Sequence, residues 1–288
     1  MSTQKKSLWR RLTGQKKAHS SPAANANEPH IYYGHWPESF RFLNAASFLR
    51  GGAQLKDWDS TKAAPFITEL LNSERHRFFQ AAMGYLFSAG VEGDYLEFGC
   101  FSAVSFRMAL TWAKMLSLPP MRFVAFDSFA GLPEVDADVA LPSWQAGTMA
   151  MSEADFMKTL REHGVGLDRV ETIPGFFDAT LTDELKAKWI AEGRRASFIN
   201  VDCDLYSSAI PVFRFIEPFL TEGTVLYVDD WFVGYRGSPE KGVAKAFREF
   251  AAQSRFRFQP FLNSGWWGRA WIAYLPAAAS DSARDRIL

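Results

Sequence analysis

Apolar residues follow two different periods along this chain of 288 residues. From Asp94 onward, short apolar runs typical of buried strands alternate with stretches in which apolar positions recur every three or four residues, as in helices. The predicted strands occupy 95–99, 123–127, 170–175, 197–202 and 224–230. The predicted helices lie near 65–90, 103–117, 152–163, 181–192, 206–219 and 239–252. Strands that alternate with helices in this way predict a parallel sheet with helices on both faces.

The pattern changes at the C-terminal end of the chain. Two further strands, at 255–262 and 269–275, are separated only by the turn 263–268, which predicts a β-hairpin. We therefore predict an α/β fold, namely a Rossmann-like doubly wound, mostly parallel sheet of about seven strands that ends in an antiparallel hairpin.

Composition divides the chain into segments. The 32 basic and 32 acidic residues balance, yet residues 1–27 carry six Lys or Arg and no acid. We expect a disordered basic tail at 1–30, a helical and aromatic N-terminal extension at 31–90, one main domain at 91–276 and a flexible C-terminus at 277–288. The aromatic part of the extension is compatible with self-association into a homo-oligomer and equally with a lid over a substrate.

The same features exclude several classes of protein. Balanced charge gives no reason to expect a nucleic-acid partner. No apolar run approaches the roughly 18 residues that span a bilayer, so we expect no stable membrane insertion. The N-terminus lacks the apolar stretch of a secretory signal, and Cys100 and Cys203 alone cannot form a disulfide framework, so we expect a cytoplasmic protein.

Acidic residues stand near the ends of the first two predicted strands, where ligands bind in open α/β sheets. Glu97 precedes Gly99, which allows a sharp turn or a close backbone approach to a ligand. The loop 97–103 lacks the G-x-G-x-x-G glycines of a dinucleotide site, which argues against NAD or FAD. Asp127 could accept both hydroxyl hydrogens of a ribose, or it could cap the turn that follows it.

More acids follow the fourth and fifth predicted strands. Asp202 and Asp204 end one strand, and Asp229 and Asp230 end the other. If these strands are neighbours, up to four carboxylates converge, and such carboxylates repel one another unless a cation lies between them. Carboxylates without His or Cys suit a hard cation such as Mg²⁺. The alternative is that some of them cap helices, and Asp204 is the first candidate for that role.

Five strings, EFGCFSAVS, FDSFAGLP, GFFDATL, VDCDLYSS and GTVLYVDDW, resemble the macrocin O-methyltransferase family of class I enzymes that use S-adenosylmethionine (SAM). The resemblance runs from about His76 to Trp231 and implies that 91–276 is a methyltransferase domain. It implies an enzyme that binds SAM and Mg²⁺ and methylates a hydroxyl of a sugar or similar small molecule.

The resemblance also assigns roles to individual residues. The residues that match the cofactor site are Glu97, Gly99, Cys100, Phe101, Ser102, Asp127 and Ser128. Those that match the metal ligands are Asp202, Asp229 and Asp230, and Asp202 is also a candidate general base.

Three positions depart from the family pattern. Ala103 and Val104 stand where members usually carry two glycines, and Cys203 replaces a glycine between two acids. Some relatives use a histidine near the C-terminus for catalysis, but this chain has none after His163.

Two other functions stay open on the sequence. The Asp-x-Asp string at 202–204 is compatible with a metal-dependent glycosyltransferase, and the fold is compatible with a non-catalytic nucleoside-binding relative. Four aromatic residues could form an apolar wall for a substrate ring or could be packed in the core: Trp231, Tyr235, Trp266 and Trp267.

Overall fold

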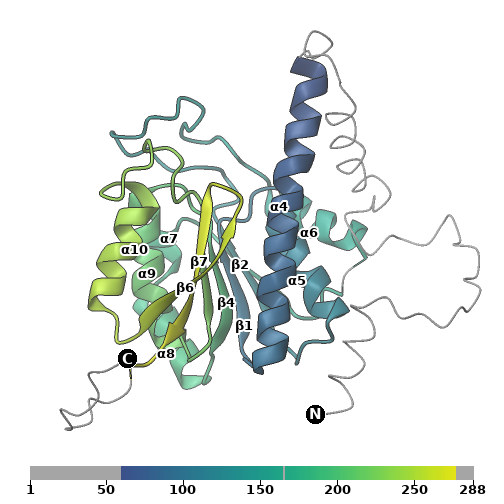
Figure 1. Cartoon of the computed structure of the whole chain (residues 1–288), viewed down its shortest axis with the longest axis vertical. Helices are drawn as coiled ribbons and strands as arrows, with labels where there is room; N and C mark the ends of the chain where they lie inside the picture. Colours follow the sequence, from purple (N-terminus) through teal and green to yellow (C-terminus); the bar gives the residue numbers. More distant parts are fainter. Residues whose placement is uncertain (1–59, 165, 277–288) are drawn as a thin grey trace, which may run out of the picture.

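A seven-stranded sheet in the order β3-β2-β1-β4-β5-β7-β6 forms the centre of the protein (Figure 1). The structure is a computed structural model that describes residues 60–164 and 166–276. The strands are β1 (Asp94–Phe98), β2 (Phe123–Asp127), β3 (Val170–Pro174), β4 (Ala196–Val201), β5 (Val225–Val228), β6 (Arg257–Ser264) and β7 (Gly268–Tyr274).

The pairing of the strands confirms the predicted fold class. β1 to β5 are all parallel, whereas β7 is antiparallel to both β5 and β6. The expected basic tail at 1–30, residues 31–59 of the N-terminal extension and the C-terminal segment 277–288 lie outside the described residues. The domain boundaries therefore stay a prediction.

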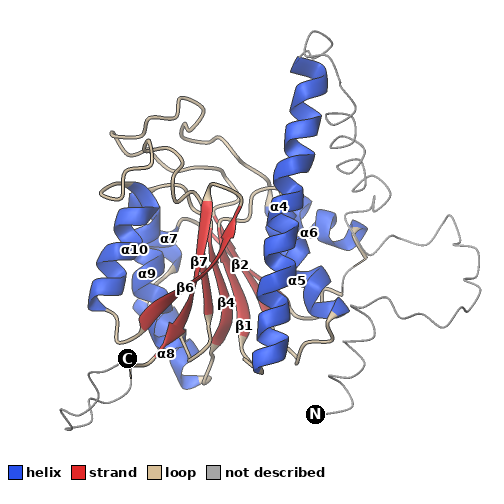
Figure 2. Cartoon of the chain, in the orientation of Figure 1, coloured by secondary structure: helices blue, strands red, loops and turns tan. Residues whose placement is uncertain are grey.

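Helices cover both faces of the sheet (Figure 2). They are α4 (Ser60–Ala89), α5 (Val104–Met115), α6 (Glu153–Glu162), α7 (Phe177–Thr180), α8 (Asp183–Ala191), α9 (Tyr206–Ile216), a 3₁₀ turn (Glu217–Phe219) and α10 (Gly242–Gln253). Among the helices of the described residues, only α7 was not predicted, because four residues are too few for a helical period to be recognised.

Two hydrophobic cores follow from the alternation of side chains along the strands. On one face, Tyr95 and Phe198 pack with α4, α5 and α6. On the other face, Leu96 and Ile199 pack with α8, α9 and α10. Because both faces are covered, the central strands are mostly apolar, which explains why they appear in the sequence as apolar runs.

Helix α4 has 30 residues and lies along the sheet, with its N-terminal part projecting past the carboxyl ends of the strands (Figure 1). Phe79 and Met83 on this helix are fully buried in the first core. The helix thus spans the height of the sheet and can bring residues to the edge where ligands are expected. Among the described residues, no helix is long and apolar enough to cross a membrane.

Candidate functional site

A cavity of about 630 Å³ opens beyond the carboxyl ends of the parallel strands. The predicted cofactor and metal residues, with the exception of Glu97, all contribute to its lining: Gly99, Cys100, Phe101, Ser102, Asp127, Ser128, Asp202, Asp229 and Asp230. Residues up to 131 positions apart in the chain therefore meet at one place, because β1 lies between β2 and β4 and β4 lies beside β5.

Glu97 lies beneath the cavity rather than in its wall. Its side chain is completely buried and accepts hydrogen bonds from Ser105 Oγ at 2.6 Å and from the Tyr95 hydroxyl. Burial raises the pKa of Glu97 to about 7, although hydrogen bonds from Ser105, Tyr95 and Asn200 oppose this shift. Ser105 itself lines the cavity, so Glu97 is one side chain removed from it. Direct contact between Glu97 and a cofactor stays a prediction.

The loop after β1 is tied to the end of β4 by Gly99. This glycine has φ +90°, and a Cβ atom at its position would lie 1.8 Å from the carbonyl oxygen of Asp202. The close backbone approach expected at Gly99 is therefore made to the protein's own chain. It fixes the distance between the loop that follows β1 and Asp202, the first of the predicted metal ligands.

Gly99→Ala is expected to lower the free energy of unfolding by about 3 kcal/mol or more, because the new Cβ collides with backbone and cannot be accommodated by a side-chain rotation. Gly193→Ala is the matched control, since Gly193 also has a positive φ (+67°) but nothing within 4 Å of the added Cβ. The control should lose only about 1 kcal/mol. Urea unfolding of both variants measures the two losses of unfolding free energy. Equal losses would contradict the close contact between Gly99 and the Asp202 backbone.

Asp127 connects two turns through its carboxylate. Oδ2 accepts from the backbone N–H groups of Cys100 at 2.6 Å and Phe101 at 3.1 Å, and Oδ1 accepts from Phe129 N at 2.7 Å. The capping role considered for Asp127 is thus confirmed. A carboxylate has about four acceptor positions, so these three bonds leave room for about one further donor, rather than the two ribose hydroxyls expected.

Ser128 uses its hydroxyl within its own turn. Its Oγ donates to the Gly131 carbonyl at 2.7 Å and accepts from Ala130 N at 3.1 Å. Ser128 lines the cavity, but both hydrogen bonds of its hydroxyl stabilise the loop 128–131. Its contact with a cofactor stays a prediction.

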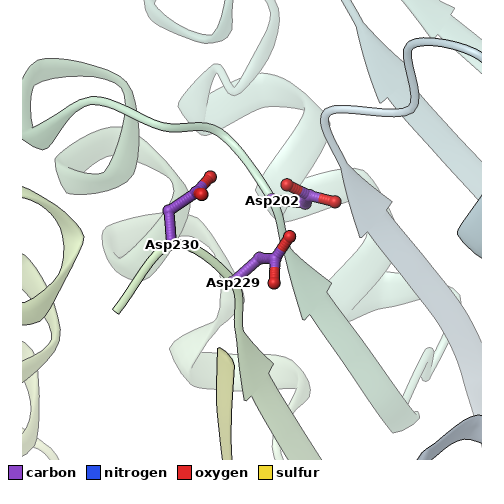
Figure 3. A group of neighbouring side chains, drawn as sticks. All are labelled: Asp202, Asp229 and Asp230. Atoms are coloured by element: carbon purple, nitrogen blue, oxygen red, sulfur yellow. The ribbon is translucent and has the colours of Figure 1, made fainter. Parts of the chain in front are cut away.

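The three predicted metal ligands come together (Figure 3). Asp202 follows β4 directly, and Asp229 and Asp230 follow β5; one carboxylate oxygen of each lies within 4.8 Å of the others. Burial, then the charge of Asp229, raises the pKa of Asp202 well above its usual value. Burial, then the charge of Asp204, likewise raises the pKa of Asp230 well above its usual value. Ionisation of all three carboxyls is therefore unfavourable unless a cation lies between them.

The donor set fits Mg²⁺ in its chemistry. Magnesium prefers oxygen ligands at about 2.1 Å, so adjacent ligand oxygens lie roughly 3 Å apart and opposite ones roughly 4 Å apart. One carboxylate oxygen of each of the three aspartates lies within 4.8 Å of the others, which is close to that range.

Asp204 does not cap the helix that follows it, so that expectation is wrong. The N-cap residue of α9 is Leu205, and no side chain caps this helix. Asp204 instead has φ +63° and lines the cavity, where its carboxyl contacts Asp230. Burial, followed by the charge of Asp202, raises the pKa of Asp204 to about 7. It is a fourth acid of the same site.

Arg75 on α4 lines the cavity, although the sequence did not predict it as a site residue. Its Nη2 lies 2.8 Å from Asp229 Oδ2, and its guanidinium lies over the ring of Trp267 at 5.7 Å. A signal was present in the sequence, since Arg75 precedes Phe79 by four residues and Met83 by eight and so shares the buried face of the helix. An arginine on a buried face requires a partner.

Two loops pack over the cavity. Leu132, Trp144, Leu205 and Tyr235 form a small core between the loops near 131–150 and 231–238, and Ala140 N donates to the Gly234 carbonyl at 2.6 Å. Of the four aromatic residues considered as a substrate wall, Tyr235 and Trp267 are buried, and Trp231 packs against Trp271. Only Trp266 is well exposed, at 65%.

Comparison with known proteins gives the family. The sequence model of the macrocin O-methyltransferase (TylF) family matches residues 41–272. The chain belongs to this family. It is also 25% identical over 182 residues to the 8-demethyl-8-(2,3-dimethoxy-α-L-rhamnosyl)-tetracenomycin-C 4′-O-methyltransferase of Streptomyces olivaceus. This match covers 61% of the chain and 65% of the relative, which is less than two thirds of the relative's length.

Solved structures agree on the fold. The O-methyltransferase NovP matches with a TM-score of 0.55 and 18% identity, over 69% of this chain and 79% of NovP. The calicheamicin methyltransferase CalS11 matches with a TM-score of 0.54 and 18% identity, over 89% of this chain and 99% of CalS11. At this level of identity the likeness concerns the fold alone.

The structure shows how the chain accommodates one departure from the macrocin O-methyltransferase pattern. Ala103, where a glycine was expected, has φ +60° and stands at the N-cap of α5. A left-handed conformation costs an L-residue about 1 kcal/mol relative to glycine. This family member therefore keeps the glycine-type backbone with alanine, whose methyl group is completely buried.

Proposed function

We propose that the protein transfers the methyl group of SAM to a hydroxyl of a sugar or similar small molecule, assisted by a divalent cation. The observation that carries this proposal is a single cavity lined both by the loop at Asp127 and by the acids Asp202, Asp229 and Asp230. Membership of the macrocin O-methyltransferase family supports it. The name of the Streptomyces relative, a methyltransferase of a rhamnosyl group, supports a sugar as acceptor.

The cofactor would lie across the ends of β1 and β2. Backbone N–H groups of Cys100 and Phe101, held by Asp127, shape that part of the cavity. Phe101 and Phe176 are 45% and 41% exposed and line the same cavity, so they offer apolar surface to a nucleoside. Asp127 would accept one ribose hydroxyl at its free position.

The acids would hold the cation and the acceptor. Asp202, Asp229 and Asp230 are the proposed ligands of Mg²⁺, which, when bound, lowers the pKa of a coordinated hydroxyl. Asp202 would take the hydroxyl proton, and Asp204 is a second candidate because it lines the cavity and caps no helix. SAM, when bound, would supply the methyl group, and the residues of this chain would hold the acceptor hydroxyl beside it and take the hydroxyl proton.

Calorimetry with SAM, with Mg²⁺ and separately with EDTA, distinguishes this function from a glycosyltransferase. We expect saturable binding of SAM at one site and, with a rhamnosyl glycoside as acceptor, formation of S-adenosylhomocysteine and a methylated product by mass spectrometry. Absence of SAM binding under both conditions would overturn the proposal and favour the Asp-x-Asp glycosyltransferase. SAM binding without release of S-adenosylhomocysteine for any hydroxylated acceptor would favour the non-catalytic relative.

A further inference from the structure

Arg75 places a positive charge inside the acid cluster. It reaches the cluster from α4, and its Nη2 lies 2.8 Å from Asp229 Oδ2. The arginine side chain is 24% exposed and that of Asp229 is 3% exposed, so the pair is screened from solvent. Burial alone would lower the pKa of Arg75, but Asp229, Asp202, Tyr227 and Asp230 together raise it. The guanidinium is therefore a permanent cation of the site.

The guanidinium has a second contact besides Asp229. It lies over the ring of Trp267, which is 6% exposed. The ring lies directly against Gly265, because a Cβ atom there would lie 1.9 Å from Trp267. Arg75 is thus held against the cluster by packing as well as by charge.

Asp229 already has a partner on each oxygen. Oδ1 accepts from the Tyr227 hydroxyl and Oδ2 accepts from Arg75. Each oxygen can accept a second contact, so a divalent cation can still bind Asp229. The cation would then share this carboxylate with a guanidinium a few ångströms away, and two cations at such a distance repel each other.

We propose that Arg75 is a built-in counter-ion that neutralises part of the acid cluster in the metal-free protein and thereby lowers its affinity for a divalent cation. This inference rests on the proposed cation site. As a consequence of this counter-ion, the protein around the acid cluster stays folded without metal. The cluster also holds a divalent cation loosely enough for the cation to exchange.

Manganese binding measures this role directly. By isothermal calorimetry, we expect Arg75→Gln and Arg75→Met to bind Mn²⁺ about tenfold more tightly than the wild type or better, because a repelling charge is gone. Arg75→Met keeps an unbranched apolar stem for packing. Arg75→Lys should stay close to the wild type. The matched control is Arg77→Gln on the same helix, because Arg77 is 64% exposed and pairs only at 3.6 Å with Glu74.

Thermal unfolding adds a readout that is independent of catalysis. In EDTA, Arg75→Gln should unfold at a lower temperature than the wild type, because the acids repel one another without their counter-ion. Mn²⁺ should restore much of that loss, so the metal-induced shift should be larger for Arg75→Gln than for the wild type or Arg77→Gln.

The outcomes separate this inference from the proposed function. Unchanged or weaker Mn²⁺ affinity in both Arg75→Gln and Arg75→Met would overturn the role of Arg75. The proposed cation site would still stand in that case if the wild type binds Mn²⁺ and Asp229→Asn does not. Absence of Mn²⁺ binding in every variant would overturn both, and SAM binding would then still stand. Loss of folding that Mn²⁺ does not restore would make Arg75 purely structural and would also overturn the inference.

Discussion

Asp229→Asn is expected to lower kcat/KM for methyl transfer by about a thousandfold at saturating Mg²⁺, since removing one preorganised electrostatic group typically costs a hundred- to a thousandfold. Asp229 is 2% exposed, belongs to the three-acid group and is the ion-pair partner of Arg75. The substitution removes a charged ligand and leaves the guanidinium without its carboxylate. Steady-state kinetics with SAM and a rhamnosyl acceptor provides the measurement.

Two controls separate chemistry from folding in this experiment. SAM affinity should be nearly unchanged in Asp229→Asn, because the proposed nucleoside position lies across β1 and β2. The double variant Arg75→Gln/Asp229→Asn removes the unpaired buried charge and should regain stability without regaining activity. Full activity of the single variant would remove Asp229, and with it the cation site, from the mechanism.

Asp127→Asn is expected to raise the Kd for SAM about a hundredfold, because hydrogen bonds to a charged acceptor contribute about 1.5–3 kcal/mol each. The carboxylate accepts three backbone N–H groups, two of them on Oδ2. An amide must present its NH₂ group on one side, so it loses bonds to one of the two turns. The KM for the acceptor should change little.

Asp183→Asn is the control for Asp127, since its side chain is 94% exposed and it lies on α8. This control should leave SAM affinity unchanged. If Asp127→Asn loses stability while its Kd for SAM stays at the wild-type value, Asp127 acts only within the loops, and the ribose contact is excluded.

The hydrophobic pattern predicted the sheet well for a physical reason. Strands buried on both faces, such as 123–126, are continuously apolar, and an acid at the end of such a strand is conspicuous. The parallel order then places those acids at one edge, so the meeting of Asp202 with Asp229 and Asp230 could be anticipated.

What the sequence could not supply depends on contacts between distant segments. Arg75 lies in a helix that was interpreted only through its apolar positions, and nothing local shows that it reaches β5. Glu97 stands near a strand end, yet Ser105 and Tyr95 hold it below the cavity. The prediction that Asp204 caps the next helix is wrong for a local reason. The chain turns with φ +63° at Asp204, and α9 begins at Tyr206, so its N-cap residue is Leu205.

A crystal of the full chain grown with Mn²⁺ and S-adenosylhomocysteine, examined by an anomalous difference map, shows whether the cation and the nucleoside share one cavity. We expect one manganese peak bound by Asp202, Asp229 and Asp230, with the nucleoside in the same cavity beside Asp127. A peak elsewhere, no peak at this cluster, or a nucleoside bound outside that cavity would contradict this expectation.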